Sequence, residues 1–207
     1  MIVIVDYKAG NLTSVRLALQ HLGVQAAVTQ DPAEVRAANR VIFPGVGAAG
    51  AAMKHLRSLG LTDALRDVVA RGTPFLGICL GTQVIFEHSE ESDGTACVGL
   101  VAGVVKRFRS LDPLCKIPQI GWNTVRFTRP HPVLAGIENE SEFYFVHSYY
   151  PAPSDPAYTI GLTKYADVEF ASAIGKDNLF ATQFHPERSG RIGLQLLRNF
   201  CAWDGTC

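Results

Sequence analysis

One cysteine stands where a predicted strand runs into a predicted helix. The segment PFLGICLGTQ at 74–83 passes from strand-forming residues through Gly77, Cys79 and Gly81 into helix-compatible ones. This Gly-X-Cys-X-Gly pattern is the layout of a nucleophile elbow with cysteine in place of serine. A thiol at a helix N-terminus lies near the positive end of the helix dipole, which favours the thiolate. The pattern indicates a nucleophile at Cys79, with an ordinary buried cysteine beside packing glycines as an equal alternative.

A thiolate nucleophile needs a base and a group that orients the base. Among the six histidines, His185 ends a β-rich run in the segment QFHPE at 183–187, and Glu187 follows two residues later. In extended backbone both side chains point to one side, and Pro186 discourages helix there. A carboxylate beside an imidazole fixes its tautomer and stabilises the imidazolium. The spacing predicts a His-Glu pair that serves Cys79, and a surface pair at a strand end is the alternative.

Acyl transfer also needs backbone N–H groups aimed at the developing oxyanion. The elbow geometry assigns one of them to Leu80, directly after the nucleophile. The turn PGVG at 44–47 follows another β-rich run and is a candidate for the second donor. A plain strand-to-helix turn needs glycine for its backbone angles too, so this signal is weak alone. The turn lacks the order and the lysine of a P-loop, which argues against phosphate binding.

The overall charge and hydropathy exclude several classes of protein. The chain has 207 residues, with 19 Lys plus Arg and 19 Asp plus Glu, so its formal net charge is zero. Hydrophobic residues make up 47% and charged residues 18%, which is too apolar for a disordered chain. Nucleic-acid-binding domains usually carry an excess of basic charge, so we expect no nucleic-acid partner.

The N-terminus and the cysteines give expectations about compartment. Asp6 interrupts the first apolar run, which predicts no signal peptide, and the longest apolar stretch, 41–53, is too short and too rich in glycine for a membrane span. Five scattered cysteines without paired spacing argue against a disulfide framework or a zinc site. We therefore expect a cytoplasmic protein that contacts no membrane and needs neither a metal nor another cofactor.

The elements that must position these residues alternate in the first half of the chain. Strands are expected at 2–5, 24–28, 40–43 and 74–78, with helices at 11–22, after Asp31, at 49–59 and at 62–70. Alternating units of this length imply crossover connections and a parallel sheet with helices on both faces.

The second half of the chain shows strand-like runs without strong helices between them. Strands are expected at 98–108, 124–127, 142–149, 158–163, 170–174 and 179–184, with a hairpin turn at 175–178 and a final helix at 192–200. No linker or repeat divides the chain. We expect one α/β domain over residues 1–207: a doubly wound, mainly parallel sheet with an antiparallel extension in the C-terminal half.

Two of these segments resemble motifs of a known family. GICLGTQ at 77–83 and QFHPE at 183–187 are similar to the nucleophile motif and the His-Pro-Glu motif of the triad-type (class I) glutamine amidotransferases, in the same order. The resemblance implies that Cys79 attacks the side-chain amide of glutamine, forms a glutamyl thioester and releases ammonia. It implies that His185 acts as general base and then acid, and that Glu187 orients it.

The same resemblance implies roles for residues around the nucleophile. Gln83 and the backbone around Ser148 and Tyr149 match positions that hold the substrate glutamine. The PGVG turn matches the loop whose backbone, at Gly47, completes the oxyanion hole with Leu80.

Four further segments narrow the resemblance within the family. DYKAGNL at 6–12, PGVG at 44–47, GWN at 121–123 and FYFVHSY at 143–149 are similar to the amidotransferase subunits of imidazole glycerol phosphate synthases, and matches span nearly the whole chain. The resemblance implies a heterodimer with a separate (β/α)8-barrel cyclase. That cyclase combines ammonia with a phosphoribulosyl intermediate of histidine biosynthesis, giving imidazole glycerol phosphate and an aminoimidazole carboxamide ribotide.

The resemblance also places residues at the partner face, and the sequence departs from the family pattern in two places. Asn11, Trp122 and Tyr144 match partner-face positions. Gln119 stands where many members carry His, and Arg188 stands where Lys is frequent. Arg keeps the positive charge but lacks the compact ammonium, so the departures bear on interface detail and not on the triad.

Two alternatives stay open. The first is the glutaminase subunit of another amidotransferase, serving anthranilate, GMP, carbamoyl phosphate or pyridoxal phosphate synthesis, against which the segments at 6–12 and 44–47 argue. The second is a non-catalytic regulatory module on the same fold. The intact Cys79, His185 and Glu187 argue against the second, because loss of one of them would be its expected mark.

Overall fold

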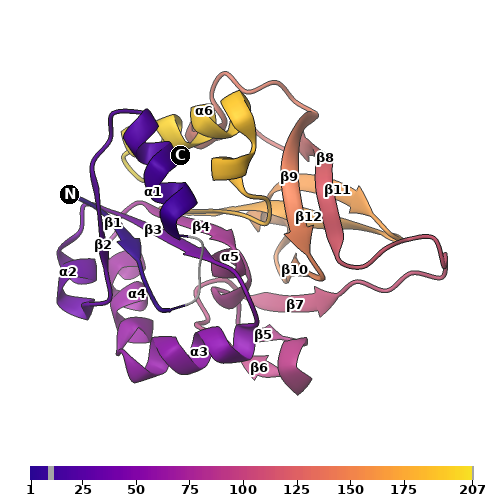
Figure 1. Ribbon diagram of the computed structural model, residues 1–207, viewed down its shortest axis with the longest axis horizontal. Helices are drawn as coiled ribbons and strands as arrows, with labels where there is room; N and C mark the ends of the chain where they lie inside the picture. Colours follow the sequence, from indigo (N-terminus) through magenta and orange to yellow (C-terminus); the bar gives the residue numbers. More distant parts are fainter. Residues whose placement is uncertain (9–11, 207) are drawn as a thin grey trace.

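A twisted sheet runs through the middle of the computed structural model, which describes residues 1–8 and 12–206 (Figure 1). One half of the nine-stranded sheet is parallel, and its strands lie in the order β2 (Ala26–Thr29), β1 (Ile2–Val5), β3 (Arg40–Gly45), β4 (Phe75–Cys79) and β13 (Leu179–Thr182). The other half is antiparallel and continues with β12 (Val168–Lys176), β11 (Thr159–Tyr165), β8 (Gln119–Phe127) and β9 (Ser141–His147). The expected fold class is confirmed.

Helices cover both faces of the parallel half. Figure 1 shows α1 (Leu12–His21) and α6 (Gly190–Ala202) on one side, and α2 (Pro32–Ala37), α3 (Ala49–Ser58) and α4 (Leu61–Ala70) on the other. Side chains of a strand alternate between the two faces, so β1 sends Val3 and Val5 into one core and Ile2 and Ile4 into the other. Burial on both faces explains why β1 is apolar at every position.

A second, smaller sheet was not predicted. Its four strands lie in the order β10 (Tyr149–Pro153), β7 (Gly103–Arg107), β5 (His88–Ser89) and β6 (Thr95–Ala96). The expected strand 142–149 is in fact interrupted at Ser148, because β9 pairs with β8 in the large sheet and β10 pairs with β7 in the small one. The expected strand 98–108 begins only at Gly103, since Val98 is buried in irregular backbone that bonds to Val84.

Short helices complete the structure. The five-residue α5 (Leu80–Val84) follows β4 directly, and the 3-10 helices are η1 (Glu91–Asp93), η2 (Pro132–Leu134), η3 (Pro156–Tyr158) and η4 (Pro186–Arg188). None of the helices in the described part of the chain has the length and apolar character needed to cross a bilayer.

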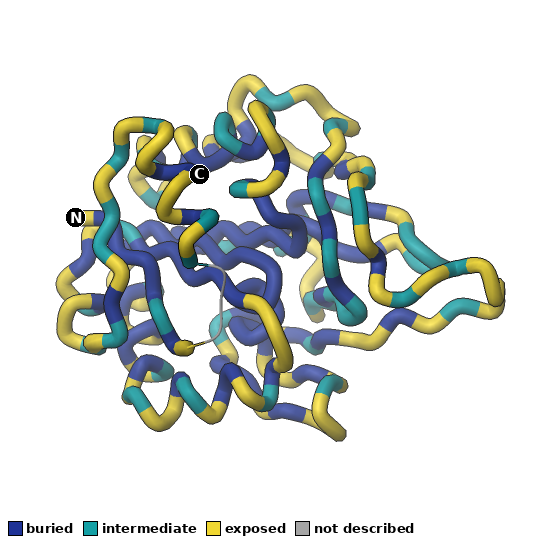
Figure 2. The backbone as a smooth tube through the Cα atoms, in the orientation of Figure 1, coloured by how far each residue is buried: buried dark blue, intermediate teal, exposed yellow. Residues whose placement is uncertain are grey.

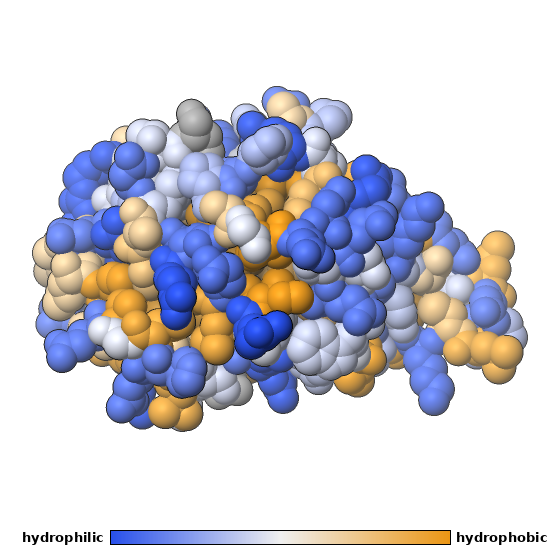
Figure 3. Space-filling view, turned by 90° about the horizontal axis from the view of Figure 1, so that it is seen from above, coloured by the Kyte–Doolittle hydropathy of each residue, from blue (hydrophilic) through white to orange (hydrophobic). Residues whose placement is uncertain are grey.

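The loop between β7 and β8 projects from the molecule. Figure 2 shows the parallel strands as buried and this loop as mostly exposed. Its Leu111 is 97% exposed and its Leu114 is 84% exposed. Apolar surface is visible at this end of the molecule in Figure 3. The loop leads into β8, which carries the exposed Trp122.

Candidate active site

Cys79 sits at a tight turn between β4 and α5. Its backbone has φ 54° and ψ −109°, a conformation that L-residues rarely adopt, and it remains 6% exposed. The glycine after it is required by close packing, because a Cβ on Gly81 would lie 1.8 Å from the carbonyl oxygen of Phe43. A strained residue at a tight strand-to-helix turn is the geometry of a nucleophile elbow. The structure therefore has the turn that the Gly-X-Cys-X-Gly pattern predicts.

The parallel sheet brings the three motifs to one edge. Strand β4 lies between β3 and β13, with Gly45 paired to Cys79 on one side and Thr182 paired to Ile78 on the other. The carboxyl ends of parallel strands form a common edge, which is where α/β folds place their ligands. The glycine-rich turn after β3 and the His-Pro-Glu segment after β13 therefore flank the Cys79 turn.

His185 and Glu187 form a buried pair. The Nδ1 atom of His185 lies 2.7 Å from Oε1 of Glu187, and their side chains are 3% and 2% exposed. The Nε2 atom of His185 has no hydrogen-bond partner among the residues described. Burial opposes protonation of His185, but the charges of the Cys79 thiolate and the Glu187 carboxylate outweigh it and raise its pKa to about 10. An imidazole that keeps its proton beside a carboxylate has the chemistry of a general acid.

A second histidine near the nucleophile has a different character. The buried His147 has its Nδ1 atom 2.7 Å from the carbonyl oxygen of Tyr149, and no carboxylate of the described residues bonds to it. Burial lowers its pKa to about 4, with the nearby His185 adding to the effect. His147 lines the cavity over Cys79, and it stays neutral there. Of the two histidines, His185 is the candidate partner for Cys79, because it alone pairs with a carboxylate.

A cavity of about 400 Å³ opens over the nucleophile. Its walls include every residue that the sequence assigned to the oxyanion hole or to the substrate, as well as Cys79 itself. These residues are Gly47, Leu80, Gln83, Ser148 and Tyr149. Gly47 has φ +98° and lies on the exposed part of its turn.

Two buried side-chain amides, those of Gln83 and Gln183, lie next to Cys79. Gln83 donates from Nε2 to the carbonyl of Tyr149 and to Oε1 of Gln183, both at 2.9 Å. Gln183 in turn places its Nε2 atom 3.7 Å from Sγ of Cys79. This chain of contacts ties α5 to β10 and to the residue before Phe184. Gln83 thus holds the wall of the cavity, a role in addition to the one its motif implies.

The cavity is also lined by two charged residues that the sequence motifs do not assign to the substrate. Glu91 and Arg188 both line it. Glu91 accepts a hydrogen bond from the N–H of Ala49 at 2.6 Å, which fixes the carboxylate at the start of α3. Glu91 comes from the short η1 segment. In the sequence it stands in the acidic run 87–93, which has no spacing typical of a binding motif. Arg188 was visible next to the His-Pro-Glu motif.

The aromatic residues assigned to the partner face lie together. Trp122 on β8 pairs in register with Tyr144 on β9, and their rings meet edge-on with centroids 6.3 Å apart. Arg188 stacks its guanidinium 4.8 Å above the Tyr144 ring. Gln119 is buried and pairs with His147, so that departure lies in the interior and not on open surface. Asn11 lies outside the described residues.

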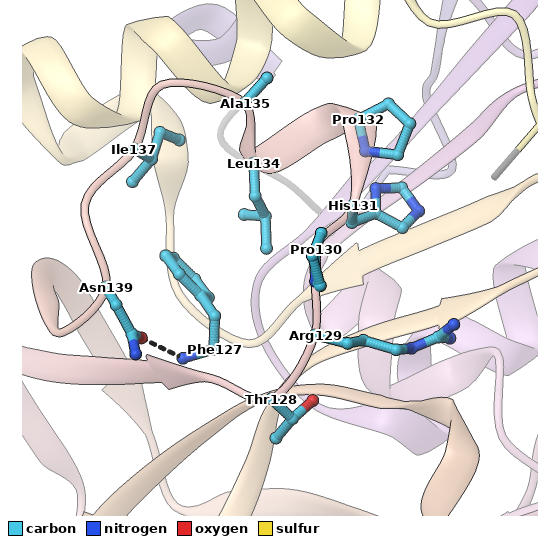
Figure 4. Close-up of a pocket in the computed structure, with 10 residues that line it drawn as sticks. All are labelled: Phe127, Thr128, Arg129, Pro130, His131, Pro132, Leu134, Ala135, Ile137 and Asn139. Carbon is cyan, nitrogen blue, oxygen red and sulfur yellow. Dashed lines mark hydrogen bonds between the residues drawn. The ribbon is translucent and has the colours of Figure 1, made fainter.

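A larger cavity of about 770 Å³ lies elsewhere, along the segment from Phe127 to Asn139 (Figure 4). Phe127 and Leu134 point toward one another across it, whereas Arg129 points away. Asn139 closes one side by accepting a hydrogen bond from the Phe127 N–H at 2.6 Å. None of the residues assigned to chemistry lines this cavity, so size does not identify the site.

In the described part of the chain, no three His, Cys, Asp or Glu side chains are grouped so that they could hold a metal ion. The cysteines at 79, 97, 115 and 201 are free thiols.

Comparison with known proteins gives the family. The description of the family "Glutamine amidotransferase class-I" matches residues 3–203, nearly the whole chain. The chain belongs to the class I glutamine amidotransferases. Within this family it is similar to proteins named imidazole glycerol phosphate synthase subunit HisH. The protein of Nitratidesulfovibrio vulgaris (strain Miyazaki F) is 50% identical, with 98% of this chain and 97% of the relative covered. That of Desulfovibrio desulfuricans is 52% identical, with 97% and 93% covered.

Solved structures of amidotransferases share the fold. A crystal structure described as a glutamine amidotransferase aligns with a TM-score of 0.76 at 18% identity and covers 100% of both chains. The glutaminase domain of a Trypanosoma brucei protein, described as CTPS with bound acivicin, aligns with a TM-score of 0.65 at 16% identity, covering 100% of this chain and 97% of that one. At this level of identity the likeness shows the amidotransferase fold alone.

Proposed function

We propose that this chain hydrolyses glutamine to glutamate and ammonia and is the glutaminase subunit of an imidazole glycerol phosphate synthase in histidine biosynthesis. One observation carries the chemistry: the strained Cys79 turn lies between the Gly47 turn and the segment with the buried His185–Glu187 pair, because the strands that precede them are parallel neighbours. The relatives named as subunits of this synthase support the reaction that the ammonia serves.

In the first half of the reaction the Cys79 thiolate attacks the amide carbon of glutamine. The carbonyl electron pair moves to oxygen, and the N–H groups of Leu80 and Gly47 stabilise the oxyanion. As the oxyanion collapses, the C–N bond breaks and the His185 imidazolium gives its Nε2 proton to the leaving nitrogen, so ammonia departs and a thioester remains. Glu187 holds Nδ1 throughout and stabilises the imidazolium.

In the second half, water replaces ammonia in the site. Neutral His185 takes a proton from the water as the oxygen attacks the thioester carbon, and the same two N–H groups hold the second oxyanion. Collapse expels the Cys79 thiolate, releases glutamate and leaves His185 protonated. The thiolate and the imidazolium are thereby restored for the next turnover.

The charges of the cavity suit the main chain of free glutamine. Its α-ammonium needs an anion and its α-carboxylate needs a cation, and the cavity offers Glu91 and Arg188. The backbone at Ser148 and Tyr149 supplies the remaining polar groups. We assign Gln83 to the wall that positions the amide end of the substrate beside Cys79.

We further propose that the partner is a (β/α)8-barrel cyclase that docks on the face around Trp122 and Tyr144 as a heterodimer. Trp122 is 55% exposed although it is a large aromatic side chain, and exposed aromatic residues are typical of interface centres. Arg188 lines the cavity and also stacks on Tyr144, so this face adjoins the place where ammonia forms. We place the reaction in the cytoplasm, where the Cys79 thiol stays reduced.

The test is ammonia release by the chain, alone and with its cognate cyclase and the phosphoribulosyl substrate. We expect slow hydrolysis alone and faster hydrolysis in the complex. Cys79→Ala should lower glutamine-dependent synthesis by roughly 10⁴-fold or more, because triad residues act as a unit. Synthesis from added ammonium salt should persist, since the cyclase does not need Cys79. Unchanged glutaminase activity in the Cys79→Ala variant would remove the nucleophile and with it the proposal.

A further inference from the structure

Gln183 is a buried polar residue to which the proposed mechanism gives no role. It follows β13 directly, two residues before His185, and it is completely buried. Its backbone N–H donates to the carbonyl of Ser172 at 2.9 Å, which fixes the main chain there. Its Nε2 atom lies 3.7 Å from Sγ of Cys79. Burying an amide costs free energy unless its polar atoms are bonded, so the partners of this side chain decide what it does.

The amide of Gln183 is oriented by hydrogen bonds that begin at a backbone carbonyl. Gln83 donates from Nε2 to the carbonyl of Tyr149 and to Oε1 of Gln183, both at 2.9 Å. A carbonyl oxygen can only accept, so Gln83 must present its NH2 group to Tyr149, and that same group must meet an acceptor on Gln183. With Oε1 of Gln183 turned toward Gln83, its Nε2 donor faces Cys79. The backbone of β10 thus determines which end of the Gln183 amide meets the nucleophile.

A donor at this place distinguishes between the two protonation states of Cys79. A thiolate accepts the hydrogen bond from Nε2 of Gln183 with a full negative charge, and hydrogen bonds to charged groups are stronger than neutral ones. A neutral thiol is only a weak acceptor, and it has an acceptor of its own in the carbonyl of Val146, 3.9 Å from Sγ. Gln183 therefore favours the thiolate without adding a charge to the site.

We propose that Gln183 is a further catalytic residue: its side-chain amide donates a hydrogen bond to the Cys79 thiolate and stabilises it both as the attacking nucleophile and as the group expelled from the thioester. The inference rests on the proposed glutaminase function. In the thioester Sγ carries no charge, so the hydrogen bond is weak there and strengthens as the thiolate leaves. Gln183 contacts Sγ, a reacting atom, but does not line the cavity over Cys79 and so does not hold glutamine.

Other titratable and charged groups also lie near Cys79, and a change at Gln183 leaves all of them in place. In the described part of the chain they are Tyr7, whose oxygen lies beside Gly45, then Glu91 of η1, His147 of β9, and His185, Glu187 and Arg188 after β13. A difference in the pH dependence of Cys79 between the wild type and a folded Gln183 variant therefore reports on the lost amide donor.

The test is Gln183→Met in the complex with the cognate cyclase and its substrate. Methionine is as long and flexible as glutamine but has no donor, and Gln83 keeps its bond to the Tyr149 carbonyl. The rate of Cys79 alkylation by iodoacetamide is measured against pH, and the modified peptide is identified by mass spectrometry.

The thiolate is the form that reacts with iodoacetamide, so a less stable thiolate moves the alkylation profile to higher pH. We expect its midpoint to rise by about one pH unit, which is about a tenfold change in the ratio of thiolate to thiol. At neutral pH kcat for glutamine hydrolysis should fall about tenfold, because less thiolate attacks and the thiolate leaves more slowly. KM for glutamine should stay unchanged.

Gln195→Met is the matched control, because it also removes a hydrogen bond between side-chain amides. Gln195 donates to Oδ1 of Asn199 at 2.8 Å within α6 and does not line the cavity over Cys79. That variant should keep the wild-type alkylation profile and kcat. Gln183→Asn draws the amide back by one methylene group, should move the profile in the same direction, and takes the place of Gln183→Met if the methionine variant does not fold.

An unshifted alkylation profile in a folded Gln183 variant overturns the inference. A loss of kcat with a lower melting temperature and an unshifted profile marks a structural role and overturns it too, as does a shifted profile with the wild-type kcat. Alkylation needs no glutamine, so the two proposals fail separately. A wild-type complex that releases no ammonia from glutamine refutes the proposed function, whereas an unshifted profile refutes the role of Gln183.

Discussion

Two turns follow neighbouring parallel strands, and they differ in how closely they are packed. The turn at Cys79, after β4, is buried, and the carbonyl of Phe43 fills the space where a Gly81 side chain would stand. The turn after β3 is exposed from Val46 to Ala48, and a Cβ on Gly47 would meet nothing within 4 Å. Both turns contain glycine beside residues assigned to the same reaction. Only the first is fixed by packing.

This difference separates two parts of one active site. The nucleophile has its position as soon as the sheet is folded, because moving Cys79 would disturb the packing between β3, β4 and α5. The second oxyanion donor has no such packing, so its orientation can respond to a partner or a substrate at small cost. With the roles proposed for Cys79 and Gly47, we expect such a site to hydrolyse little glutamine until the Gly47 turn is set, which would suit a subunit whose ammonia is needed only when the acceptor is present.

The largest effect is expected from a methyl group added to the fixed turn. Gly81→Ala places a Cβ 1.8 Å from the Phe43 carbonyl, within a central strand that cannot move aside. We expect the free energy of unfolding to fall by about 3 kcal/mol, the upper range for overpacking, and glutaminase activity to be lost. Urea denaturation measures the free energy of unfolding, and ammonia release measures the glutaminase activity. A variant with normal stability and turnover would show that this turn is as tolerant as its neighbour.

The next effect concerns the carboxylate that pairs with His185 beside the fixed turn. Glu187→Gln keeps an oxygen that accepts a hydrogen bond from Nδ1 of His185 but removes the carboxylate charge. We therefore expect kcat to fall roughly 10²-fold, which is less than the fall expected when the imidazole adopts the wrong tautomer. The pKa of His185, raised to about 10 in the wild type, should decrease. The imidazolium then loses its proton at lower pH, and the alkaline decline of kcat should move to lower pH.

The raised pKa of His185 also makes the folding stability depend on pH, and in the same direction as kcat. A raised histidine pKa stabilises the fold fully below the ordinary value of about 6.5 and ceases to do so as pH rises through the folded value. Glu169→Gln, which breaks only the exposed ion pair with Arg126, is the control. A pH profile of kcat that is the same in Glu187→Gln and wild type would contradict the role of Glu187.

Local patterns were enough to predict the fixed turn. Glycines on both sides of Cys79 predict the tight geometry, and the two-residue spacing of His185 and Glu187 predicts the pair that is observed. The alternating strands and helices predict the parallel half, where β1, β4 and β13 are buried at every position because both faces are covered. Parallel neighbours then place the turns at one edge without further information.

The remaining features depend on contacts between distant segments. Nothing local shows that Ser148 is the point where the chain leaves one sheet for another, since aromatic, strand-forming residues stand on both sides of it. Glu91 reaches the cavity because η1 packs against the start of α3, and Tyr7 reaches Gly45 because β1 lies beside β3. Such positions follow from which strands pair, and a single sequence contains no local signal for that pairing.

The smallest of these effects, and the most direct test of the comparison, comes from the loose turn. Gly47→Ala adds a methyl group to open space, but φ +98° is strained for an L-residue, so the turn should relax to another conformation. We expect the unfolding free energy to fall by no more than about 1 kcal/mol while kcat in the complex falls about tenfold, less than the loss of an entire oxyanion donor. Gly136→Ala, with φ +72° and equally open space but outside the active-site cavity, should show the same small loss of stability and normal kcat. If both alanine variants turn over glutamine at the wild-type rate, the conformation of the Gly47 turn does not govern the reaction, and the contrast between the two turns concerns packing alone.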